Sequence, residues 1–175
     1  MSKKFKLRKN SIIALHGRRT LVFRIFNKLA NGILIFLYKI YFLPLFGIGR
    51  KIVLIHTLGR KTGKKRTTPT LIFTSYTGIW TLYVARGRKS NWLNNILAIS
   101  DGIIRIQKGF KTKKVKAKLM TNKEEKFKHL KFYLERLPEA NMIFGYNKKK
   151  HGDVSNSAEF ASILEKIEFV QLEFI

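Results

Sequence analysis

The sequence predicts a mainly antiparallel α+β domain, in which about six short strands close into a β-barrel with added helices. Three observations support this prediction. Apolar and β-branched runs of strand length recur along the chain. Hairpin-length turns join several of these runs, and no regular β-α-β series is present. The sequence also contains no internal repeat and no second stretch of domain-like composition.

Composition narrows the classes of function. The 175 residues are 45% hydrophobic, which is enough for a single domain with a real core. The chain has no cysteine, so disulfides, thiolate metal sites and cysteine nucleophiles are excluded. Its histidines show no metal-ligand spacing, and we expect no metal site. The formal net charge of +26 attracts nucleic acid, anionic lipid or anionic small molecules without choosing among them.

The N-terminal region is predicted to be a basic flexible arm over residues 1–19, followed by an apolar helix over 20–43. The helix ends before Pro44, because the residue before a proline disfavours helical backbone. Its apolar second half is shorter than the roughly 20 residues that span a bilayer, and Lys39 interrupts it. The helix therefore packs on the domain, rests on a membrane surface, or does both. We expect no signal peptide, since no apolar core with a cleavage site follows the arm.

The stretch Lys51–Pro69 combines strand-like and anion-binding features, and it predicts strands at 51–58 and 66–77. Glycines let a backbone approach an anion closely, and cations with hydroxyls donate to phosphate oxygens. Two interpretations remain, a phosphate-binding loop and a solvated basic turn. The residues between the two apolar runs carry these groups: Gly59, Arg60, Lys61, Thr62, Gly63, Lys64, Lys65, Arg66, Thr67 and Thr68.

A third strand, over 79–85, leads into a second basic glycine-containing turn, Arg86-Gly87-Arg88-Lys89. Ser90 is a suitable N-cap for a short helix over 91–99. Asparagine competes with helical backbone hydrogen bonds, so Asn94 and Asn95 inside this helix indicate either specific polar contacts or simple exposure.

The remainder of the chain predicts a hairpin, two helices and a closing strand. Residues 103–120 alternate as a hairpin that turns near Gly109, with one cationic face on its second strand. Thr121 to Glu124 matches a capping box for a helix that stops at Pro138. A loop at 148–152 precedes a helix capped by Asn156 and running through Ile167, and the last strand spans 168–175.

Taken in order, several of these motifs resemble the deazaflavin-dependent nitroreductase and quinone reductase family of flavin-binding split β-barrels. The stretch from Gly59 to Pro69 resembles the GRKSGKxRxxP signature of that family. The segments 84–87, 91–95 and 169–173 resemble its second cofactor loop, its tryptophan- and asparagine-bearing helix, and its closing strand. The resemblance covers roughly residues 25–175 and implies a single split-barrel domain over 20–175.

The resemblance implies that coenzyme F-420, a 5-deazaflavin with a phosphate and an acidic tail, binds in the barrel groove. The first loop would surround the anionic part, and the second loop would lie against the deazaflavin or its ribityl chain. Tyr133 and Tyr146 are candidates for the acceptor pocket. No catalytic side chain is assigned, because the cofactor carries out hydride transfer. The implied cofactor-binding residues are Arg60, Lys61, Thr62, Gly63, Lys64, Arg66, Thr67, Thr68, Pro69, Ala85, Arg86, Gly87, Trp92 and Asn95.

The resulting functional prediction is an oxidoreductase that binds F-420 and transfers hydride to or from an electron-poor acceptor, such as a quinone or nitro compound. One alternative is a split-barrel protein that binds FMN. Another is a basic protein that binds nucleic acid or a membrane surface without catalysis, with cationic Lys114, Lys116 and Lys118 and stacking by Trp92. We expect nucleic-acid binding to be weak and nonspecific. The expected location is the cytoplasm, with peripheral contact to the inner face of the membrane.

Overall fold

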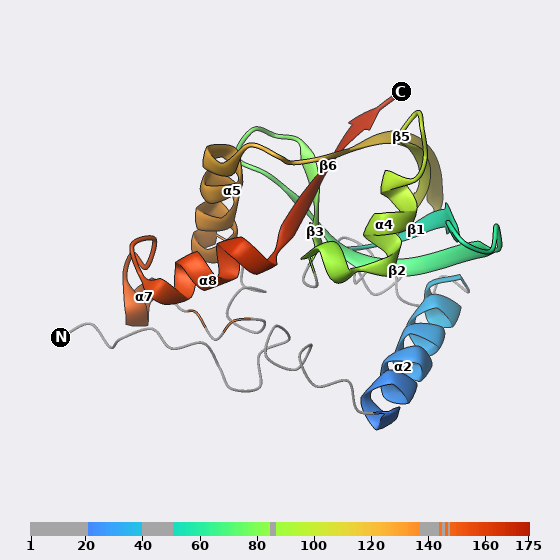
Figure 1. Cartoon of the computed structure of the whole chain (residues 1–175), viewed down its shortest axis with the longest axis horizontal. Helices are drawn as coiled ribbons and strands as arrows, with labels where there is room; N and C mark the ends of the chain where they lie inside the picture. Colours follow the sequence, from blue (N-terminus) through green and yellow to red (C-terminus); the bar gives the residue numbers. More distant parts are fainter. Residues whose placement is uncertain (1–20, 40–50, 85–86, 137–143, 145, 147) are drawn as a thin grey trace.

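The computed structural model describes residues 21–39, 51–84, 87–136, 144, 146 and 148–175. The predicted basic arm at 1–19 lies outside these residues and remains a prediction. Figure 1 shows a barrel with helices α5, α7 and α8 on one side and helix α2 below the β1–β2 hairpin.

Six antiparallel strands close into a barrel in the order β1-β2-β3-β6-β5-β4. This topology confirms the predicted mainly antiparallel α+β class. The turn between β4 and β5 falls at Gly109, as the alternation predicted, and Gly109 has a φ of 59°. The strands are β1 (Ile52–Leu58), β2 (Lys65–Thr74), β3 (Trp80–Val84), β4 (Ile103–Lys108), β5 (Lys111–Leu119) and β6 (Glu168–Phe174).

The barrel interior is filled by branched apolar side chains from every strand. Successive residues of a strand point to opposite faces, so alternate positions can line the interior. On β4 and β5, for example, Ile104, Ile106 and Val115 are buried, whereas Arg105 and Lys114 are exposed. Burying this apolar surface supplies the main driving force for closing the sheet.

A second core lies outside the barrel, between the sheet and helices α5 (Lys123–Arg136) and α8 (Ala158–Lys166). It is dominated by aromatic rings. Tyr83 of β3 stacks on Tyr133 of α5 with ring centroids 5.1 Å apart, and Phe169 of β6 packs edge-on against Phe73 of β2. These contacts hold the helices against strands β2, β3 and β6.

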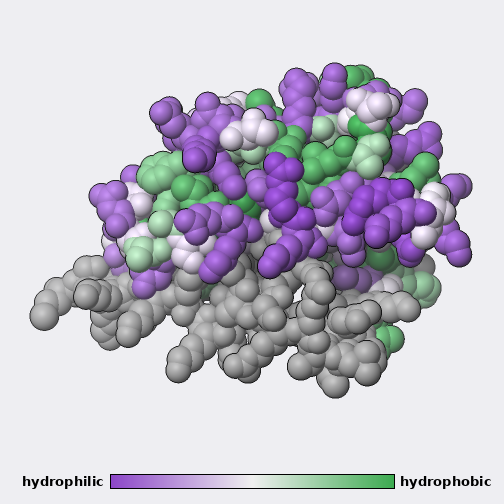
Figure 2. Space-filling model, viewed as in Figure 1, coloured by the Kyte–Doolittle hydropathy of each residue, from purple (hydrophilic) through white to green (hydrophobic). Residues whose placement is uncertain are grey.

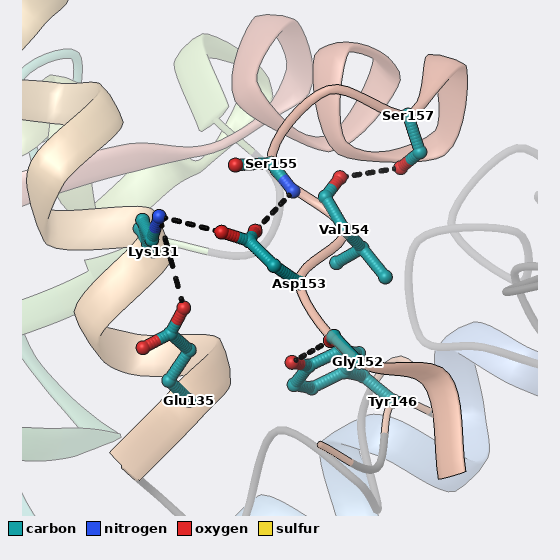
Figure 3. Close-up of polar contacts among 8 residues, drawn as sticks. All are labelled: Lys131, Glu135, Tyr146, Gly152, Asp153, Val154, Ser155 and Ser157. Carbon is teal, nitrogen blue, oxygen red and sulfur yellow. Dashed lines mark hydrogen bonds and ion pairs between the residues drawn. The ribbon is translucent and has the colours of Figure 1, made fainter. Parts of the chain in front are cut away.

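The segment before α8 is tied to α5 by charge and hydrogen bonds (Figure 3). The Lys131 ammonium lies 2.8 Å from Asp153 Oδ2, and the Ser155 N–H donates to Asp153 Oδ1 over 2.8 Å. Both interactions favour the carboxylate, with the lysine contact the larger, and they hold the pKa of Asp153 well below its usual range. One helical turn, α7 (Lys148–His151), replaces the predicted loop beside this segment.

Both predicted helix caps are displaced by one residue. The α5 cap is Asn122, whose side chain accepts a hydrogen bond from the Glu125 N–H over 3.1 Å. The α8 cap is Ser157, which accepts from the Phe160 N–H over 3.1 Å. A cap acceptor serves the N–H two or three residues further along, so neighbouring polar residues can take either register. Tertiary packing selects between them.

Helix α2 (Leu21–Lys39) packs its C-terminal half against the outer side of β1. Tyr38 is fully buried there, and its hydroxyl donates to the carbonyl of Ile52 over 3.0 Å and accepts from the Gly109 N–H over 2.7 Å. The helix thereby contacts the barrel as predicted. The predicted extension to residue 43 lies outside the described residues.

Candidate cofactor-binding site

The loop between β1 and β2, residues 59–64, is a tightly closed turn that we call the first loop. The Gly59 N–H donates to the Lys64 carbonyl over 2.9 Å, and the Gly63 N–H donates to the Gly59 carbonyl over 2.7 Å. Gly63 has a φ of 64°, a left-handed conformation that glycine adopts without strain. These bonds fix the backbone, so the side chains project from a defined turn.

The cationic side chains of the first loop, and that of Arg66 on β2, have no carboxylate partner among the described residues. Arg60, Lys61, Lys64 and Arg66 are all exposed. None of them takes part in an ion pair within the described part of the chain. An uncompensated cluster of this kind attracts an anion, and guanidinium and ammonium groups suit phosphate and carboxylate oxygens. The donor set therefore fits the phosphate and acidic tail of the implied cofactor.

Helix α4 (Asn91–Leu97) holds the first loop through Asn95. The Asn95 Oδ1 accepts from the Arg60 backbone N–H over 3.2 Å and from the Arg60 guanidinium over 3.4 Å. The side chain is 8% exposed, so the specific-contact interpretation is confirmed and simple exposure is wrong. Two predicted site residues are thus in direct contact, with Asn95 positioning the loop.

The same helix also holds the second loop, residues 85–89, of which 85 and 86 lie outside the described residues. Asn94 Nδ2 donates to the carbonyls of Arg88 and Ser90, each over 2.9 Å. Ser90 occupies the N-cap position, as predicted, although its hydroxyl makes no capping hydrogen bond. Trp92 is partly buried and packs against the barrel core. Adjacent asparagines of one short helix therefore bind both predicted loops.

Gly87 is required by the fold itself. It begins the one-turn helix η2 (Gly87–Lys89) with a φ of 50°. A Cβ atom at this position would overlap the carbonyl oxygen of Lys166, at the end of α8. The close approach to α8 gives this glycine a structural role beside its predicted cofactor contact.

Glu168 of β6 also holds the second loop in place, through an ion pair with Arg88. The sequence did not indicate this role. The Glu168 carboxylate lies 3.2 Å from Arg88 Nε and 3.2 Å from Lys126 Nζ. The residue is only 9% exposed, so the two cations stabilise a largely buried charge. The signal available in the sequence was an acidic residue directly before the apolar pair Phe169-Val170 at the start of the strand.

Thr67, Thr68 and Pro69 lie on β2 close to the first loop, where they pair with His56, Ile55 and Leu54 of β1. All three are partly buried. Thr67 Oγ1 is 3.1 Å from His56 Nδ1. These residues therefore continue the protein surface from the first loop along β2.

The two candidate acceptor residues lie in the aromatic core between the sheet and the helices. Tyr133 and Tyr146 are each 1% exposed. The Tyr146 hydroxyl donates to the Gly152 carbonyl over 2.8 Å, and Tyr133 stacks on Tyr83. The Tyr83 hydroxyl is buried and has no hydrogen-bond partner among the described residues. Burial raises the pKa of this phenol well above its usual value.

The closed antiparallel barrel carries a hydrogen-bonded loop rich in cations, and these donors suit an anionic ligand. Residues 45–144, more than half of the chain, match the F420H(2)-dependent quinone reductase family. The chain therefore belongs to this family. It is an oxidoreductase, and its cofactor is coenzyme F-420.

Other comparisons are more distant. An F420-H2 dependent reductase (FDR-A) shares 21% identity over 71% of this chain and 95% of its own, with a TM-score of 0.40. Atu2129 from Agrobacterium tumefaciens, of unknown function, shares 13% over 73% of this chain and 52% of its own, with a TM-score of 0.43. No curated protein matches the sequence.

Proposed function

We propose that the protein transfers hydride between F-420 and an electron-poor small molecule such as a quinone or a nitro compound. The observation that carries this proposal is the first loop, a hydrogen-bonded turn held by Asn95. Its cations Lys61 and Lys64, and Arg66 just beyond it on β2, form no ion pair within the described part of the chain. Bound F-420 supplies the hydride chemistry. The chain supplies binding and orientation, which is the usual division in cofactor enzymes.

In this proposal the anionic part of the cofactor lies at the first loop, with Arg60, Lys61, Thr62, Gly63, Lys64, Arg66 and Thr67 around it. Thr68 and Pro69 lead toward the ring. Ala85, Arg86, Gly87 and Trp92 would complete the pocket from the second loop and α4. Tyr133 and Tyr146 remain candidates for the acceptor pocket. Because both are buried, an acceptor would have to reach the aromatic core to contact them.

A fluorescence titration of the purified protein with F-420 and with FMN tests the cofactor preference. The expected result is saturable binding of F-420 and much weaker binding of FMN. Reduced F-420 is then mixed with a panel of quinones and nitroaromatics, and its reoxidation is followed by absorbance. Turnover with any of these acceptors supports the proposal, and binding without turnover of any of them contradicts the acceptor class.

We also propose peripheral contact with the inner face of the membrane, from the cytoplasm, through α2. Leu29, Ile33 and Phe36 are each about three-fifths exposed and recur at i, i+4 and i+7. Tyr38 points to the opposite, barrel-facing side of the helix. Among the described residues, no helix is both long and apolar enough to cross a bilayer. An exposed apolar stripe on a helix without acidic residues suits an anionic surface.

Flotation with anionic and neutral vesicles tests this second proposal. The wild-type protein should float with anionic vesicles at low salt, and Ile33→Ser with Phe36→Ser should remain at the bottom. The double variant should retain F-420 binding, because the stripe lies on the face of α2 that points away from the barrel. Failure of the wild-type protein to float overturns membrane contact without affecting the cofactor proposal.

Nonspecific nucleic-acid binding is the remaining candidate, and it is supported by charge. Figure 2 shows hydrophilic side chains over most of the described surface of one face. Neutralising several phosphates makes affinity fall steeply with salt. We expect retention of nucleic acid at low salt and none near physiological salt. Tight binding at physiological salt, unaffected by saturating F-420, would contradict the assignment of the cationic loop to the cofactor.

A further inference from the structure

A row of polar residues crosses the outer face of the barrel on four neighbouring strands. Thr67 of β2 pairs with His56 of β1, His56 pairs with Arg105 of β4, and Arg105 pairs with Lys114 of β5. On β1, β4 and β5, the adjacent residues Ile55, Ile106 and Val115 are buried in the barrel core. The side chains of the row therefore point outward. We call these residues the outer row.

His56 sits at the centre of the outer row among cations. Burial, together with Lys39 of α2 and Arg105 of β4, lowers its pKa from the usual value. Thr67 of β2 contributes a hydroxyl 3.1 Å from His56 Nδ1. No carboxylate acts on His56, and none forms an ion pair with Lys39, Arg105 or Lys114 within the described part of the chain.

This arrangement provides donors for an anion and leaves positive charge uncompensated. A guanidinium, an ammonium, an imidazole and a hydroxyl can all donate to phosphate or carboxylate oxygens. Like charges on one face repel one another, and a bound anion relieves that repulsion. The chemical class of ligand that the outer row fits is therefore a small polyanion with phosphate or carboxylate groups.

The outer row begins where the first loop ends. Lys65 opens β2 directly after the first loop, and Thr67 follows two residues later on the same strand. We infer that the outer row is a second anion subsite that binds the acidic tail of F-420 while the first loop binds its phosphate. This inference rests on the proposed function. It adds His56, Arg105 and Lys114, which no motif resemblance marks as cofactor residues.

Binding measurements with matched ligands test the inference. The first ligand is F-420, and the second is a deazaflavin fragment that keeps the phosphate and lacks the acidic tail. Arg105→Ala should weaken F-420 binding about tenfold, as expected for one lost charge-assisted hydrogen bond, and leave fragment binding unchanged. Lys128→Ala is the control, because it removes the same charge from an exposed position on α5. Thermal unfolding checks that each variant is folded.

Four outcomes of this experiment are decisive. The inference is supported if Arg105→Ala loses affinity for F-420 but not for the tail-free fragment, while Lys128→Ala keeps its affinity for both. An equal loss of F-420 affinity in Arg105→Ala and Lys128→Ala overturns the inference, because the overall electrostatic field of the protein is then responsible. Unchanged F-420 binding in Arg105→Ala also overturns it and leaves the proposed function standing. If the wild-type protein binds no F-420, the proposed function itself fails.

The His56 ring provides an independent readout by NMR. Contact with an anionic tail should raise the pKa of His56, whereas the tail-free fragment should leave it unchanged. Affinity for F-420 should then increase as the pH falls through the His56 pKa, and His56→Asn should lose this increase. Inorganic phosphate is the third ligand. If phosphate raises the pKa of His56 but F-420 does not, the row binds a free anion and the tail assignment is wrong.

Discussion

At the residue scale, the charges of the first loop are the sharpest test of the site. Lys61→Ala and Arg66→Ala should each weaken F-420 binding by roughly ten- to a hundredfold, because a hydrogen bond to a charged group is worth roughly 1.5–3 kcal/mol. The measurement is a fluorescence titration. Neither change should lower the melting temperature of the cofactor-free protein much, since exposed loop charges contribute little to stability.

Lys128→Ala again serves as the control, because Lys128 is exposed on α5 and outside both loops. If all three variants lose the same affinity, the net charge binds the cofactor and the first loop has no special role. A selective loss in Lys61→Ala and Arg66→Ala assigns the phosphate to the loop.

Gly87 allows a prediction about stability. Gly87→Ala should destabilise the fold by more than the roughly 1–2 kcal/mol that a left-handed alanine costs, because its Cβ atom would also overlap the Lys166 carbonyl. Gly78→Ala is the matched control. Gly78 has a φ of 79°, but a Cβ atom added there would meet no other atom within 4 Å. Chemical denaturation should therefore show a larger loss for Gly87→Ala, and equal losses would contradict the predicted clash.

His56 introduces a pH dependence of stability. Its pKa is lowered in the folded protein relative to the usual 6.5, so the unfolded chain binds more protons just below that pH. Stability should therefore rise with pH between the folded-state pKa and about 6.5. His56→Asn should flatten this part of the profile, as measured by denaturation across the pH range. An unchanged profile would show that His56 is not the responsible group.

At the element scale, α4 determines the position of both loops. Asn95→Ala removes the acceptor for the Arg60 N–H and should cost about 1 kcal/mol of unfolding free energy. Hydrogen exchange at the Arg60 amide should become faster. Asn95→Asp keeps an oxygen acceptor at this position and should preserve slow exchange. If both variants exchange at the wild-type rate, Asn95 does not hold the loop.

The element scale also shows where patterns in the sequence were sufficient. Strand and helix positions followed from alternation and apolar runs, because side-chain periodicity is a local property. The caps at Asn122 and Ser157 were each displaced by one residue, since adjacent polar residues offer nearly equal local acceptors. The helical turn of α7 was missed for a similar reason, because a basic run carries no periodic signal.

At the scale of the whole molecule, the net charge of +26 destabilises the compact state through self-repulsion. Raising the ionic strength screens this repulsion, so the melting temperature of the cofactor-free protein should increase with moderate salt. Added F-420 should raise it further at low salt, because a ligand that binds only the folded state stabilises that state. A melting temperature that falls with moderate salt would show that attractive ion pairs dominate instead.

The sequence by itself determined the fold class, the order of the strands along the chain and the cationic first loop. Each of these depends on local residue patterns, and the first loop also carries a motif that resembles a known family. It also identified Asn95 as unusual, since a polar residue within a short helix stands out without any structure.

Only the tertiary structure decided which residues meet across the chain. Asn95 binds Arg60, Glu168 binds Arg88 and Lys126, and Tyr133 and Tyr146 are buried in the aromatic core. The outer row exists only because the strand register aligns Thr67, His56, Arg105 and Lys114. Register in a closed barrel is set by how all strands pack at once, and no local stretch of sequence contains that information.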